Sequence, residues 1–153
     1  MAEKMKRIDG KEASRKIARA NVKTESIQKV KAVVLSAEEA KDLVDRIGPS
    51  LGCDYTSGPV FPKTRNDVAA VRRTAEDGSD YGYDTIYLVW KTKSGAIKSK
   101  ELMDSSSSKD YVHVKDVTET KSTINVKVAS GGSFSGQAWD DTISVSKKEI
   151  GLK

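Results

Sequence analysis

The chain has 153 residues, of which 37% are hydrophobic and 32% are charged, and its net charge is +5. This length suits one hydrophobic core and excludes two full domains. No apolar run approaches the roughly 20 residues of a membrane-spanning helix, so we expect no membrane partner. A single cysteine excludes an internal disulfide, which favours a cytoplasmic location.

The positive charge is concentrated near the N-terminus. Residues 1–31 hold ten basic and four acidic side chains, whereas the remainder holds 17 basic and 18 acidic ones. We therefore predict a basic N-terminal arm at residues 1–27, marginally helical or disordered, followed by a single domain at 28–153. Such an arm can attract phosphate or an acidic protein surface, and it can equally act as a solubilising tail.

The first predicted elements after the arm are a strand and a helix. Residues 29–35 form a β-branched run that is typical of a strand. Ser36 and Glu39 have the spacing of a capping box, which predicts a helix that begins there. The buried stripe of this helix is expected to consist of Leu43, Val44 and Ile47. Gly48 and Pro49 should end it, with the glycine in a left-handed conformation.

The middle of the chain is predicted to be loop-rich. Residues 48–66 contain all three prolines of the sequence. We interpret residues 66–75 as a second short helix, with Val68, Ala69 and Val71 facing the core.

The second half of the sequence has the alternating pattern of β-strands. Strands are predicted at residues 84–92, 96–104, 111–117, 123–129 and 142–146. Their short connections favour antiparallel neighbours, because parallel strands need a long crossover. The predicted fold class is therefore α+β, with an antiparallel, meander-like sheet in the C-terminal half and one or two helices from the N-terminal half.

The hairpin turns predict which side chains share a face. A two-residue loop at Ser94 and Gly95 would place Lys91 opposite Lys98 and Tyr87 opposite Leu102. A second hairpin centred on Thr120 would place Val112, Val114, Ile124, Val126 and Val128 on the inside. The outer face would then display nine residues, which are Tyr87, Lys91, Lys93, Lys98, Lys100, Tyr111, His113, Lys115 and Lys127.

This lysine-rich face suggests a binding surface for RNA or DNA. Cations would contact the phosphates while Tyr87 and Tyr111 offer stacking surfaces for bases. Lysines on an exposed sheet face also keep a sheet soluble and discourage edge pairing, so the same residues fit a purely structural role.

Other residue groups give weaker indications of function. The acidic segment from Glu76 to Asp84 lacks a complete calcium-loop pattern, and whether it binds a cation stays open. Cys53 and His113 are too few for a zinc site and have no signature of a nucleophile pair around them. The glycine-rich residues 130–136 lack the lysine and helix of a phosphate loop. We therefore predict no catalytic residue, no metal site and no cofactor.

These observations lead to one hypothesis and one alternative. The hypothesis is a non-enzymatic nucleic-acid-binding module that uses the lysine-rich sheet face and the basic arm. The alternative is a protein-interaction or assembly module without catalytic activity, in which the arm docks on an acidic protein partner. The oligomeric state does not follow from the sequence.

Overall fold

The computed structural model describes residues 33–79 and 81–153. The predicted arm at 1–27 and most of the predicted strand at 29–35 lie outside these residues. The elements in chain order are α3 (Ala37–Ile47), β1 (Tyr55–Thr56), β2 (Val68–Glu76), β3 (Gly82–Lys91), β4 (Ile97–Asp104), β5 (Val112–Glu119), β6 (Thr123–Ser130) and β7 (Trp139–Ser146).

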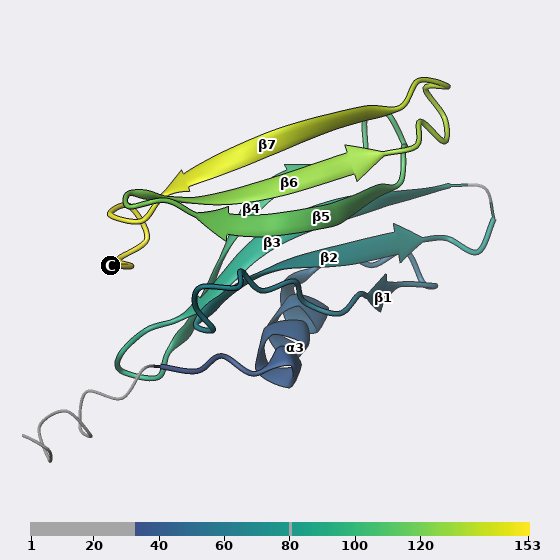
Figure 1. Cartoon of the computed structure of the whole chain (residues 1–153). Helices are drawn as coiled ribbons and strands as arrows, with labels where there is room; N and C mark the ends of the chain where they lie inside the picture. Colours follow the sequence, from purple (N-terminus) through teal and green to yellow (C-terminus); the bar gives the residue numbers. More distant parts are fainter. Residues whose placement is uncertain (1–32, 80) are drawn as a thin grey trace, which may run out of the picture. The chain divides into compact units, whose positions relative to one another are not determined.

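The strands form two antiparallel sheets, one of four strands in the order β1-β2-β3-β4 and one of three in the order β5-β6-β7. The larger sheet lies between helix α3 and the smaller sheet (Figure 1). The sequence correctly predicted antiparallel strands, but the single meander-like sheet is wrong and the described part is mostly sheet with one helix. The chain leaves the first sheet after Asp104 and begins the second at Val112.

Helix α3 begins where the sequence predicts. The Ser36 hydroxyl accepts a hydrogen bond from the Glu39 N–H, and the Glu39 carboxylate accepts one from the Ser36 N–H. These two bonds satisfy amide groups that have no partner within the helix. The inward stripe consists of Ala40 and Val44 with half-buried Leu43, whereas Ile47 is 45% exposed and was wrongly predicted to be buried.

The helix predicted at residues 66–75 is wrong, because β2 occupies this segment. Both faces of β2 are covered, one by α3 and the other by the smaller sheet. Val68 and Ala70 pack in one core, while Ala69 and Val71 pack in the other. A strand that is buried on both sides loses its alternating pattern, and a short apolar run of this kind resembles a helix.

The predicted β3–β4 register is wrong by one residue. Lys91 lies opposite Ile97 and Trp90 opposite Lys98. The Thr92 N–H donates to the Ala96 carbonyl oxygen, so the loop has three residues and ends at Gly95. Gly95 has a φ of 91°, which a glycine adopts easily at this position of a three-residue hairpin. Because side chains alternate, the slip sends Lys91 and Lys98 to opposite faces.

The predicted inside of the β5–β6 hairpin is confirmed, although its centre is not Thr120. Glu119 lies opposite Ile124, which moves the centre to the turn at Lys121 and Ser122. A bulge between Val114 and Asp116 adds one residue to β5 and offsets this shift, so that Val112 and Val114 still face inward. The predicted inward residues of this hairpin are therefore buried or packed against the core, namely Val112, Val114, Ile124, Val126 and Val128.

Candidate nucleic-acid interface

The four-stranded sheet does not present the predicted lysine face to solvent. Tyr87 is only 6% exposed and packs with Leu35 and Val44 beneath α3. Lys91 lies on the same face, and its Nζ is 2.9 Å from Oε2 of Glu39 in the helix. A ring beneath a helix cannot stack on a base, so Tyr87 is not part of an exposed platform.

The other predicted site residues are divided between further surfaces. Lys98 and Lys100 project from the opposite face of β4, and Lys100 is 3.8 Å from Glu149. The three residues His113, Lys115 and Lys127 are exposed on the three-stranded sheet. Tyr111 precedes β5 and donates its hydroxyl proton to Glu76. The hypothesis of one shared face for all nine residues is therefore wrong.

A different group of cations meets at one end of the strands. We call this the basic end and define it by residues 62–67, 91–98, 119–123 and 147–153. These segments hold nine basic and three acidic side chains. The β3–β4 turn, the β5–β6 turn and the residues after β7 lie together at the left in Figure 1.

Hydrogen bonds and ion pairs hold these segments together. The Arg65 guanidinium contacts Asp67 at 2.6 Å and Glu119 at 3.2 Å. Glu119 also accepts from Lys147, whose Nζ is 2.5 Å away and which is only 7% exposed. These contacts, with Lys147 first and the Thr64 hydroxyl second, lower the pKa of Glu119 to about 2. Its carboxylate therefore carries a full charge at neutral pH.

The acidic groups of the basic end are thus used by its inner cations. Asp67 and Glu119 neutralise Arg65 and Lys147, and Glu149 faces Lys100. Six exposed lysines at this end have no ion-pair partner among the described residues, namely Lys63, Lys93, Lys98, Lys121, Lys148 and Lys153. Their side chains are exposed to solvent.

The opposite end of the strands is acidic. We call it the acidic end and define it by residues 52–54, 76–79, 81–84, 104–111 and 131–141. These segments hold nine charged side chains, of which only Lys109 is basic. Strands β2 to β7 are 8–10 residues long, so about 30 Å separates the two ends.

Buried Asp110 anchors the loop between β6 and β7 at the acidic end. Its carboxylate accepts hydrogen bonds from the N–H groups of Phe134 and Ser135, from the Ser135 hydroxyl and from the Trp139 indole. These donors, the Ser135 N–H first, hold the pKa of Asp110 well below its usual range. The negative charge of Asp110 is therefore stabilised by hydrogen-bond donors within the fold.

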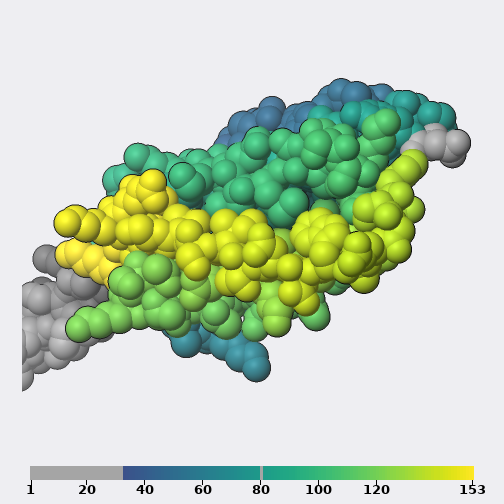
Figure 2. Space-filling view, turned by 90° about the horizontal axis from the view of Figure 1, so that it is seen from above, coloured from purple at the N-terminus to yellow at the C-terminus, as the bar shows by residue number. Residues whose placement is uncertain are grey.

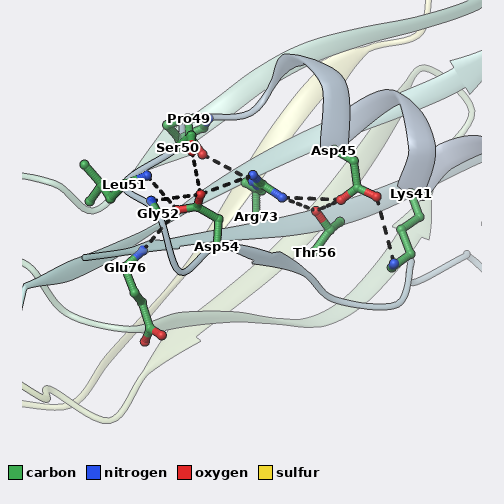
Figure 3. A network of polar contacts seen from close by, with 10 residues as sticks. All are labelled: Lys41, Asp45, Pro49, Ser50, Leu51, Gly52, Asp54, Thr56, Arg73 and Glu76. Atoms are coloured by element: carbon green, nitrogen blue, oxygen red, sulfur yellow. Dashed lines mark hydrogen bonds and ion pairs between the residues drawn. The ribbon is translucent and has the colours of Figure 1, made fainter. Parts of the chain in front are cut away.

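Asp54 performs a similar task for the loop before β1. It accepts from the Ser50 hydroxyl and from three backbone N–H groups, which lowers its pKa to about 2. Buried Arg73 lies beside it and also contacts Asp45 and Thr56 (Figure 3).

The stem of Arg73 also explains the glycine that ends α3. Gly48 has a φ of −73°, so the left-handed conformation predicted from the sequence is wrong. A Cβ atom at Gly48 would lie 2.7 Å from Cγ of Arg73. The position therefore excludes larger residues because of close packing and not because of backbone conformation.

Asp84 connects the two sheets through their buried interior. Its Oδ1 accepts from the Thr74 hydroxyl at 2.5 Å, and its Oδ2 accepts from the Val112 N–H at 2.6 Å. Burial raises the pKa of Asp84, although both hydrogen bonds and Arg72 oppose this effect. The carboxylate that the sequence grouped with Glu76 and Asp77 thus points into the core.

The remaining sequence motifs do not converge on a reactive site. Asp77 accepts from Ser79 of its own turn, and Glu76 accepts from Tyr111. Within residues 33–79 and 81–153, no three His, Cys, Asp or Glu side chains form a group able to hold a metal ion. The helix in this part of the chain is too short and too polar to cross a membrane.

Sequence reasoning missed the lysines that complete the basic end. Lys63, Lys121, Lys148 and Lys153 are distant from the predicted strands or lie in their turns. The only relevant signal in the sequence was its net positive charge, and this charge indicated the N-terminal arm and not these lysines. Comparison with family models, with curated proteins and with solved structures yields no match to this chain.

Proposed function

We propose that this protein is a non-enzymatic nucleic-acid-binding module whose basic end contacts the phosphate backbone. The observation that carries the proposal is the group of six exposed lysines that have no acidic partner in the described part of the chain. Clustered ammonium groups attract a polyanion over a distance of about one Debye length and release its counterions on contact.

The N-terminal sequence supports the same assignment. Residues 1–31 carry an excess of six positive charges. The described part begins at Val33, and the neighbouring Leu35 N–H donates to the carbonyl oxygen of Asn66 at the basic end. The chain therefore joins its most basic sequence to its most basic folded surface.

The proposal uses only some of the residues that the sequence suggested. Lys93 and Lys98 belong to the basic end, whereas Lys115 and Lys127 lie on the outer face of the smaller sheet. The two predicted stacking rings, Tyr87 and Tyr111, do not belong to the basic end. We therefore expect binding to phosphates without strong base selectivity. The single free cysteine, Cys53, is compatible with the reducing cytoplasm in which we place the protein.

Fluorescence anisotropy with single-stranded and double-stranded oligonucleotides at low salt tests the proposal. The double variant Lys93→Gln, Lys121→Gln should weaken binding. It should also lower the slope of log affinity against log salt by about 0.7–0.9 for each phosphate contact removed. The matched control Lys115→Gln, Lys127→Gln removes the same charge from the smaller sheet and should bind like the unaltered chain.

Two outcomes would contradict the proposal. The first is the absence of binding to every oligonucleotide at low salt. The second is an equal loss of affinity in both double variants, which would indicate attraction to net charge without a defined surface. Binding to an acidic protein in place of any nucleic acid would support the assembly alternative.

A further inference from the structure

The outer edge of β7 is an unpaired strand edge. In the part of the chain that the structure describes, β7 pairs with β6 only. In the view from above, the yellow strip of residues 139–153 is uncovered along its length (Figure 2). A strand edge presents a row of N–H and C=O groups that another strand can use.

The backbone of β7 directs hydrogen-bonding groups toward this edge. The Thr142 N–H donates to Oδ1 of Asp141 at 2.8 Å, so it is not bonded to β6. In an antiparallel ladder, alternate residues bond to opposite sides. The N–H and C=O groups of Thr142, Ser144 and Ser146 therefore face the free edge.

The other strand edges of the described part carry protective features that residues 142–146 of β7 lack. β1 has only two residues. β4 has a bulge at Leu102, between the partners of Ile86 and Tyr87, and carries Lys98, Lys100 and Glu101. β5 has its own bulge beside the charged Lys115. Residues 142–146 of β7 are regular and uncharged. Charges and bulges are the usual means of preventing edge pairing, so β7 is the edge open to a partner.

The charges that flank this uncharged run are self-complementary. Asp140 precedes it and Lys148 follows it, and both are exposed. In an antiparallel pair centred on Ser144, Asp140 at the start of β7 would lie by the end of β7 in a second copy, where Lys148 is in the turn that follows the strand. Ile143 would lie opposite Val145 of that copy and would lose its remaining exposure. The same strand thus supplies both halves of a symmetric contact.

We propose that two copies of this chain pair through β7 and form a continuous six-stranded sheet. A single pair of eight-residue strands is smaller than a standard interface of about 1,600 Å². The dimer should therefore dissociate on dilution. The two strands run in opposite directions, so the basic ends of the two copies point away from each other. This inference does not depend on nucleic-acid binding.

Sedimentation velocity of the full chain over a range of concentrations tests the proposal. The unaltered chain should shift from monomer to dimer as its concentration rises. Ser144→Lys places two like charges on the two-fold axis and should weaken dimerisation by up to about fivefold. Ser144→Glu should do the same, whereas an equimolar mixture of the two variants should restore the dimer.

Two control variants separate pairing from other effects. Ser144→Ala removes the hydrogen bond from the Ser144 hydroxyl to Asn125 without adding charge, and it should dimerise normally. Thr118→Lys adds the same charge in the same cross-strand row, two strands away from the β7 edge. It should also dimerise normally. A chain that is monomeric at every concentration would overturn the proposal, as would a mixture that stays monomeric or a Thr118→Lys variant as impaired as Ser144→Lys.

Discussion

The two ends of the folded part employ their charges in opposite ways. At the acidic end, Asp54 and Asp110 accept hydrogen bonds from backbone N–H groups and fix the loops that contain them. At the basic end, two partly buried ion pairs use Asp67 and Glu119, and six exposed lysines have no ion-pair partner among the described residues. The sign of the charge on a surface therefore does not reveal whether its charged side chains already have hydrogen-bond or ion-pair partners within the fold.

This difference decides which end we assign to binding. A carboxylate that already accepts several hydrogen bonds gains little from an external cation, because its oxygens are occupied. An exposed lysine has three free donors and a strongly hydrated charge, and it can exchange water for phosphate. The acidic end should therefore respond to mutation mainly in stability and the basic end mainly in binding.

The largest loss of stability is expected for Asp84→Ala at the acidic end. This change leaves the Thr74 hydroxyl and the Val112 N–H without their acceptor in the interior between the sheets. Each buried donor without a partner costs about 1–3 kcal/mol, so we expect the two together to lower the free energy of unfolding by about 2–6 kcal/mol. Urea denaturation followed by circular dichroism measures it.

Asp104→Ala is the control for Asp84→Ala. Asp104 is exposed, and among the described residues it accepts only from Ser106 of its own turn. Its replacement should cost less than about 1 kcal/mol. Equal losses in the two variants would show that the link between the sheets through Asp84 is not specific.

An intermediate, pH-dependent effect is expected for Glu119→Gln at the basic end. The pKa of Glu119 is lowered to about 2, so its stabilising contribution is present above its ordinary pKa and is lost as the pH falls toward 2. The variant leaves buried Lys147 without its counter-charge. It should be less stable than the unaltered chain at pH 7 and should approach it in stability near pH 2.

Urea denaturation at pH values between 2 and 7 measures this convergence. Thr118→Ser is a suitable control, because this exposed neighbour of Glu119 carries no charge. A constant difference in stability between Glu119→Gln and the unaltered chain across this range would refute the assigned role of the ion pairs.

The smallest effect on stability is expected for the variant Lys93→Gln, Lys121→Gln. Neither lysine has an ion-pair partner among the described residues. Their replacement should change the free energy of unfolding by no more than about 0.5 kcal/mol. A thermal or urea melt measures this directly. A loss above about 1 kcal/mol would mean that these lysines support the fold, and the contrast between the two ends would fail.

Local features of the fold followed well from the sequence. The capping box of α3 depends on residues three apart, and the inward face of β5 and β6 depends on alternation within each strand. Register was harder to predict, because a loop of two residues and a loop of three residues fit the same sequence at Ser94 and Gly95. That difference of one residue separated Lys91 from Lys98.

The candidate site could not be assembled from the sequence for a related reason. Lys63 and Lys148 are 85 positions apart, and their segments are brought to one end because Glu119 contacts both Arg65 and Lys147. No local pattern records this proximity. The burial of Tyr87 likewise depends on α3 crossing its face, which the alternation of β3 does not reveal.

The sequence by itself determined the antiparallel strands, the start of α3 and the uneven distribution of charge, because each depends on neighbouring residues or on composition. Tertiary structure alone decided that there are two sheets, that β2 is a strand and that lysines from four segments share one end. These features depend on which surfaces are buried against each other, and burial is a property of the packed chain.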